Sequence, residues 1–131
     1  MALIATELQG YSNTFKKTLW ADLAYNFNEI VVNDAAATLA VGTLLGLVTA
    51  TGKYKVCVQT AVDGSQIPAA IVSVAETIPA TTDTAVLAMT RGPASVNKGG
   101  LILGASYDND TKKNTAYAAL EAKGIQVLNA V

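Results

Sequence analysis

Few side chains of this 131-residue chain could do chemistry. It contains no histidine and a single cysteine, Cys57. Without histidine there is no imidazole metal ligand and no Ser-His or Cys-His pair. Cys57 lies on the polar side of an alternating stretch, where Lys53 and Lys55 are the obvious cations that could favour a thiolate. We interpret Cys57 as a small space-filling residue, and we expect no enzyme activity and no cofactor.

Asp108 and Asp110 have the spacing of two calcium ligands. An EF-hand loop would need a further oxygen ligand and then a glycine, but Lys112 and Lys113 occupy those two positions. We expect Asp110 to cap a helix instead, because its carboxylate can accept the free N–H groups of a first turn. The glycine-containing stretches match neither the P-loop nor the dinucleotide-binding pattern. The sequence therefore predicts no metal site and no phosphate site.

The composition predicts a chain that buries surface against something else. Hydrophobic residues make up 51% and charged residues 15%, against about 25% charged in an average domain. The net charge of −1 creates no field that would recruit nucleic acid. Residues 35–51 form an uncharged run long enough to span a membrane, but its threonines and glycines favour strands. We expect a protein partner, with no nucleic acid and no membrane.

The pattern along the chain predicts a mainly β, α+β domain. Alternating and apolar runs predict strands at residues 29–33, 43–50, 53–60, 67–75, 84–90, 94–97 and 125–128. Asp63 and Gly64 are expected to form a hairpin turn, and residues 34–37 and 78–83 are expected to be connections. One helix is predicted to begin near residue 110 and to end at Gly124.

The first 28 residues differ in character from the rest, which sets a predicted boundary between an arm at 1–28 and a β-rich domain at 29–131. Apolar spacing from Leu8 to Leu23 would allow a weak amphipathic helix in part of the arm. One interpretation is that the aromatic residues of this segment fill the core. The other is that the arm orders on a partner, with aromatic anchors and positioning lysines. The candidate contact residues are Tyr11, Phe15, Lys16, Lys17 and Trp20.

From about residue 38 to the end, the order of motifs resembles the tailed-phage head decoration proteins, the family of the phage lambda decoration protein D. The motifs are GTLLG at 42–46, TATGKY at 49–54, DGSQ at 63–66, RGPA at 91–94 followed by VN at 96–97, DTKKNTAY at 110–117 and AKGIQV at 122–127. The first 28 or so residues lie outside this resemblance.

The resemblance implies a small β-barrel, tulip-like domain with one short C-terminal helix and an extended N-terminal arm. It implies a cement protein that binds the major capsid protein on the outer surface of an expanded phage head and stabilises the head against internal DNA pressure. It also implies that the lambda-like members assemble as homotrimers with the N-terminal arm contacting the coat, and that the protein carries out no catalysis. The chain would be made in the host cytoplasm and would end up in the virion.

Other functions stay open from the residues alone. The composition also suits another self-assembling virion or tail structural protein. An enzyme is suggested only by Cys57 and scattered carboxylates, and a small membrane protein only by residues 35–51.

Overall fold

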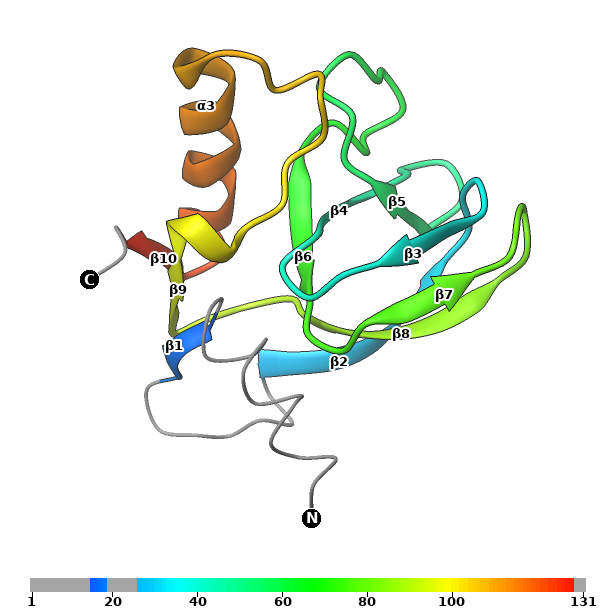
Figure 1. Cartoon of the computed structure of the whole chain (residues 1–131), viewed down its shortest axis with the longest axis horizontal. Coiled ribbons are helices and arrows are strands. Elements are labelled where there is room, and N and C mark those ends of the chain that lie inside the picture. Colours follow the sequence, from blue (N-terminus) through cyan, green and yellow to red (C-terminus); the bar gives the residue numbers. More distant parts are fainter. Residues whose placement is uncertain (1–14, 19–25, 129–131) are drawn as a thin grey trace.

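The computed structural model describes residues 15–18 and 26–128, and its centre is a closed five-stranded barrel (Figure 1). The order of strands around the barrel is β2-β5-β4-β6-β8. Antiparallel pairing joins every neighbouring pair except β2 and β5, which close the barrel in parallel where Val32 lies opposite Tyr54. The barrel strands are β2 (Phe27–Val32), β4 (Leu44–Leu47), β5 (Tyr54–Val56), β6 (Pro68–Val72) and β8 (Thr84–Met89).

Alternate residues of the barrel strands enter two separate apolar clusters, because successive side chains of a strand point to opposite faces. Ile30 and Val32 of β2, for example, join the cluster inside the barrel. Phe27, on the opposite face of the same strand, joins a second cluster outside the barrel. The inner cluster consists of Ile30, Val32, Leu39, Leu45, Ala70, Val72, Ile78, Val86 and Ala88.

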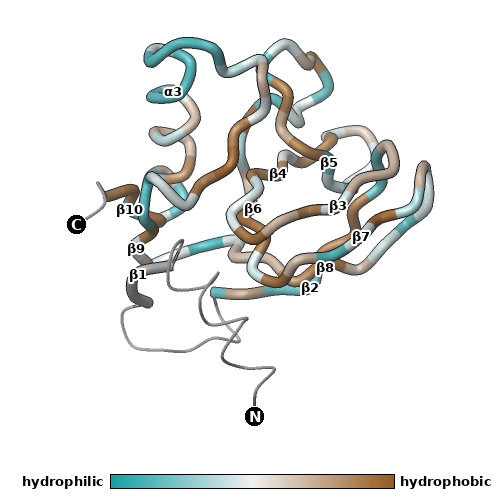
Figure 2. Tube along the Cα trace, viewed as in Figure 1, coloured by the Kyte–Doolittle hydropathy of each residue, from teal (hydrophilic) through white to brown (hydrophobic). Residues whose placement is uncertain are grey.

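The outer cluster forms where the C-terminal part of the chain packs against the barrel wall. This part contains β9 (Ala94–Asn97), the short 3-10 helix η1 (Lys98–Gly100), α3 (Asp110–Glu121) and β10 (Ile125–Leu128). Ala116 and Leu120 are the buried residues of α3. The first turns of α3 are hydrophilic and its later turns are apolar, so only the later half supplies core (Figure 2).

A second sheet lies beside the barrel and contains β1 (Phe15–Thr18) in the order β1-β9-β10. β10 pairs with β9 in parallel, and β1 pairs with it in antiparallel register, with Phe15 opposite Val96 and Thr18 opposite Ala94. The register shifts between Phe15 and Lys17. The chain therefore brings its first described strand and its last strand onto the two sides of β9.

The predicted fold class is confirmed: the domain is β-rich, contains a small barrel and has one short helix near its C-terminus. All seven predicted strands are present, most of them shorter than expected. The run at 35–51 contains strands rather than a helix, as expected. Within the described ranges, none of the helices combines the length and the apolar character that crossing a bilayer would require.

Several local predictions are wrong. The expected connections contribute to a two-stranded sheet of β3 (Ala37–Leu39) and β7 (Glu76–Ile78), in which the buried Leu39 and Ile78 join the inner cluster. Runs of three residues are too short for periodicity to reveal them. Phe15–Thr18 form a strand, not part of a helix, because β9 offers them backbone partners.

Two predicted turn details also need correction. The helix is capped by Asn109, whose side-chain oxygen accepts from the N–H of Lys112 at 2.9 Å, and Asp110 is its first residue. Asp63 and Gly64 do not join paired strands, because β5 and β6 both pair with β4 and not with each other. Gly124 follows the helix with φ +84°, a conformation that favours glycine.

Candidate functional site

The structure anchors part of the predicted contact segment to the domain. Phe15, Lys16 and Lys17 belong to β1, which pairs with β9. Tyr11 and Trp20 lie outside the described residues. The sequence did not reveal this attachment, since β9 is about 80 residues further along the chain. The contact role of these five residues remains a prediction.

β9 is a firm attachment point because both its edges and one of its faces are engaged. β10 pairs with it along Ala94–Asn97, and β1 occupies the other edge. Ala94 and Val96 are buried in the outer cluster. The residues before Phe15 are therefore covalently joined to β1, and β1 is paired with β9, a strand that the core holds in place.

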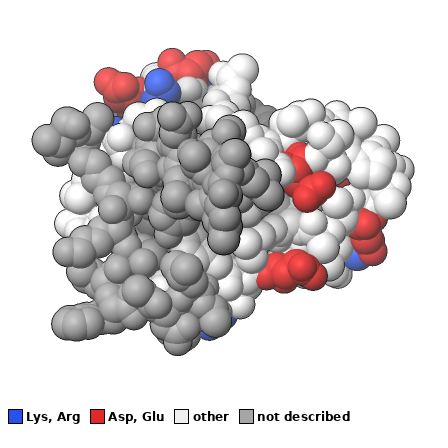
Figure 3. Space-filling model, turned by 60° about the horizontal axis from the view of Figure 1, so that its bottom comes forward, with Lys and Arg blue, Asp and Glu red and all other residues white. Residues whose placement is uncertain are grey.

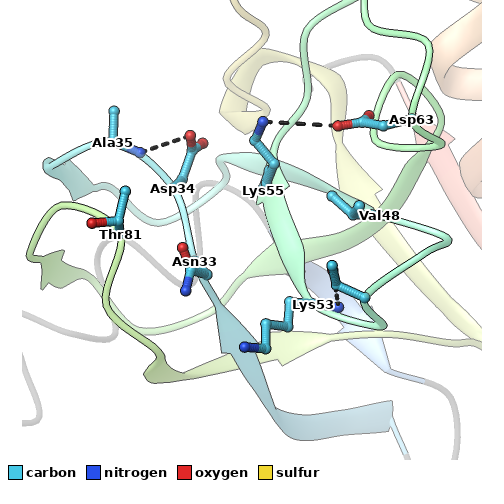
Figure 4. Close-up of a pocket in the computed structure, with 9 residues that line it drawn as sticks. Asn33, Asp34, Ala35, Val48, Lys53, Lys55, Asp63 and Thr81 are labelled. Carbon is cyan, nitrogen blue, oxygen red and sulfur yellow. Dashed lines mark hydrogen bonds and ion pairs between the residues drawn. The ribbon is translucent and has the colours of Figure 1, made fainter.

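A polar groove of about 380 Å³ lies over the seam where β2 and β5 close the barrel (Figure 4). Asp34 fastens the seam: its carboxylate accepts from the backbone N–H of Ala35 at 2.7 Å and from that of Val56 at 3.0 Å. The backbone N–H of Asn33 donates to the carbonyl of Tyr54 at 3.0 Å. β2 and β5 are paired at one position only, Val32 opposite Tyr54, and these hydrogen bonds continue the contact between the two strands beyond it.

Both lysines that line the groove form ion pairs, one of them with an aspartate outside the lining. Lys53 Nζ lies 2.9 Å from Asp83, which also accepts from Asn33 Nδ2 at 2.7 Å. The hydrogen bond from Asn33, followed by that from Lys53, lowers the pKa of Asp83. Lys55 Nζ lies 3.8 Å from Asp63. Because Asp63 and Asp83 come from separate loops, no local pattern in the sequence indicated that they would meet the two lysines.

The DGSQ motif folds back onto β4. The Asp63 carboxylate accepts from the backbone N–H of Ser65 at 3.0 Å and from its hydroxyl at 2.5 Å, and these bonds lower the pKa of Asp63. The carbonyl of Asp63 accepts from the N–H of Thr49 at 3.0 Å. A Cβ at Gly46 would overlap the carbonyl of Ser65, so this close approach requires glycine. The GTLLG and DGSQ motifs therefore pack directly against each other, through Gly46 and Ser65.

Cys57 has the surroundings of a structural residue. It is 2% exposed and belongs to the outer cluster. Burial raises the pKa of its thiol to about 12, and the hydrogen bond with Tyr107 offsets only part of this rise. Tyr107 Oη donates to the carbonyl of Gln66 at 2.9 Å, which ties the loop before β6 to the segment before α3. A thiol with such a pKa is protonated at neutral pH and is a poor nucleophile.

The aspartates near α3 stabilise the start of the helix. Asp108 accepts from Lys112 Nζ at 3.0 Å, and this bond lowers the pKa of Asp108. Across residues 15–18 and 26–128, no three His, Cys, Asp or Glu side chains gather as metal ligands would. Among the described residues, the polar side chains discussed above therefore stabilise loops, the barrel seam and the start of α3.

Comparison with known proteins points to a structural role. The family model described as bacteriophage lambda head decoration protein D matches residues 19–125. The match begins earlier than the resemblance seen in the sequence, and it covers the barrel, β9 and α3. No curated protein matches the chain individually. Because the family model spans most of the chain, the protein belongs to the phage lambda head decoration protein D family, a family of structural proteins of the phage head.

Proposed function

We propose that this protein is a cement protein that binds the outer surface of an expanded phage head and stabilises it against internal DNA pressure. The family match carries this proposal. The partner is the major capsid protein, and the active form is a homotrimer. The protein carries out no catalysis, in keeping with the protonated, buried thiol of Cys57.

The attachment of β1 to β9 supports a role for the N-terminal arm in capsid binding. Fourteen residues precede Phe15, and fully extended they would reach up to about 50 Å. Their attachment point is fixed by β9, which limits the volume that the arm must search for the coat. Within the arm, Tyr11 precedes β1 and Trp20 follows it, so aromatic side chains suited to anchoring occur on both sides of the strand.

A strand edge offers a second kind of contact. β1 pairs with β9 on one side, and the pairings of its sheet leave its other edge without a strand among the described residues. An extended coat-protein segment could add there through backbone hydrogen bonds. Each such contact is small, but many equivalent copies on one head would together give a large stabilisation.

The test mixes the purified protein with expanded heads that lack a decoration protein. We expect the protein to co-sediment with these heads at saturable stoichiometry and to raise the temperature at which they release DNA. Unexpanded heads serve as the control and should bind less. Failure to co-sediment with expanded heads from the phage that encodes the chain would contradict the proposal.

A further inference from the structure

Half of the outer wall formed by β2 and β8 is open to solvent and apolar. At one end of this wall, Phe27 and Met89 are buried under the C-terminal elements. Further along the same face, Val31 and Leu87 are each 42% exposed. Leu87 lies opposite the exposed Glu29 in the register of the two strands. An apolar strip beside charged residues is the usual composition of a protein interface.

The two halves of the molecule carry opposite net charge. Residues 26–89, which include the barrel, have a net charge of −3 from five acidic and two basic residues. Residues 90–128 have a net charge of +2 from five basic and three acidic residues, and β1 adds Lys16 and Lys17. The barrel and the C-terminal elements lie at opposite ends of the long axis (Figure 1). Figure 3 shows several separate acidic side chains over the barrel half of this face, and a further acidic group, next to a basic side chain, at the opposite end.

Charges that are not paired within the chain occur in both halves. Among the described residues, Glu29 and Glu76 of the barrel half make no ion pair. The same holds for Lys113 and Lys123 of the C-terminal half. Both halves therefore present charge that is available to a partner.

We propose that the open wall of β2 and β8 docks against the C-terminal half of a second copy of this chain, in a head-to-tail contact. A contact between two barrel walls would bring like charges together, whereas the head-to-tail arrangement pairs opposite charges. Such a heterologous contact closes into a ring when its rotation allows. The inference rests on the proposed function in one respect: the ring is the trimer of the capsid-bound protein.

The experiment measures the mass of the free protein by sedimentation equilibrium at low and high salt. We expect wild-type trimers that dissociate as salt rises, because exposed charges are screened. Glu29→Lys should weaken association by about tenfold or more, since it places like charges in contact. Glu121→Lys is the matched control: it changes the charge equally but at the basic end, and association should not weaken.

Reciprocal substitution gives the sharpest test. Lys123→Glu alone should also weaken association, and the double variant Glu29→Lys with Lys123→Glu should recover most of the loss. Circular dichroism confirms that each variant is folded. A wild-type monomer, equal effects of Glu29→Lys and Glu121→Lys, or no recovery in the double variant would overturn the inference.

Capsid binding is measured in parallel, so that the two proposals can fail separately. A protein that binds heads as a monomer would overturn the head-to-tail contact and leave the decoration role intact. Salt-sensitive trimers that do not bind heads would support the contact and contradict the decoration role. If Glu29→Lys left the trimer unchanged but abolished head binding, the wall would be a coat-protein contact and the inference would be wrong.

Discussion

Gly92 and Gly124 lie in backbone contact where the turn before β9 meets the turn after α3. The N–H of Gly92 donates to the carbonyl of Lys123 at 2.9 Å, and the N–H of Ala94 donates to that of Gly124 at 3.2 Å. A Cβ at Gly92 would overlap the carbonyl of Gly124. The RGPA and AKGIQV motifs thus contact each other through their backbones at a chain crossing. This contact sets the parallel register of β9 and β10.

Gly92→Ala should therefore destabilise the domain by about 1–3 kcal/mol, because the overlapping atom belongs to backbone that is hydrogen-bonded in place. Urea denaturation followed by circular dichroism measures this loss. Gly99→Ala is the matched control, since a Cβ there would meet only the side chain of Asn97 at 3.7 Å. Equal stability of the two variants would show that the crossing tolerates a side chain.

Asn26 is a second test of the same region. The residue is 2% exposed, and its Nδ2 donates to the carbonyls of Arg91 at 3.0 Å and Pro93 at 3.3 Å. Asn26→Ala should cost about 1–3 kcal/mol, because those carbonyls lose their donor. Asn26→Asp should cost at least as much, since a carboxylate cannot donate. Asn114→Ala, at an exposed position of α3, should leave the denaturation midpoint nearly unchanged.

The loop carboxylates predict a loss of stability in acid. The pKa values of Asp63, Asp83 and Asp108 are all lowered in the folded protein, so the folded state binds fewer protons than the unfolded chain. Their contribution is present above the ordinary value of 3.8 and is lost as the pH falls below it. Thermal melting between pH 6 and pH 2.5 should show a falling midpoint.

Asp63→Asn should make this pH dependence shallower, because one of the shifted groups no longer titrates. It should also lower the melting temperature at pH 6, since an amide accepts more weakly from Ser65 than a carboxylate does. Glu76→Gln provides the comparison, as it removes an exposed carboxylate that has no hydrogen-bond partner among the described residues. If Asp63→Asn followed the wild-type curve, the Asp63–Ser65 bonds would contribute nothing measurable.

If the proposed function is right, two deletions within the arm should separate the effect on folding from the effect on capsid binding. Removal of residues 1–14 leaves β1 in place and should preserve the melting temperature while weakening head binding strongly. Removal of residues 1–20 also exposes the edge of β9, so this variant should aggregate more readily. Co-sedimentation with expanded heads and light scattering measure the two effects. Undiminished head binding by both deletions would rule out the arm as a contact.

The sequence by itself determined the fold class and the absence of obvious catalytic pairs. Period-2 alternation in stretches such as 84–90 predicts barrel strands because one face must be buried, and Gly124 marks the end of the helix through its backbone conformation. The ordered motifs also predicted the family that the comparison confirmed. These signals are local, and each can be read from a few neighbouring residues.

Only the tertiary structure decided which distant residues meet. The attachment of β1 to β9, the seam fastened by Asp34, and the crossing of Gly92 and Gly124 all join segments separated by more than 20 residues. The unequal charge of residues 26–89 and 90–128 can be counted in the sequence, but the structure decided that these two segments lie at opposite ends of the molecule. Backbone pairing and charge distribution depend on how the whole chain is arranged in space, and no local pattern specifies that arrangement.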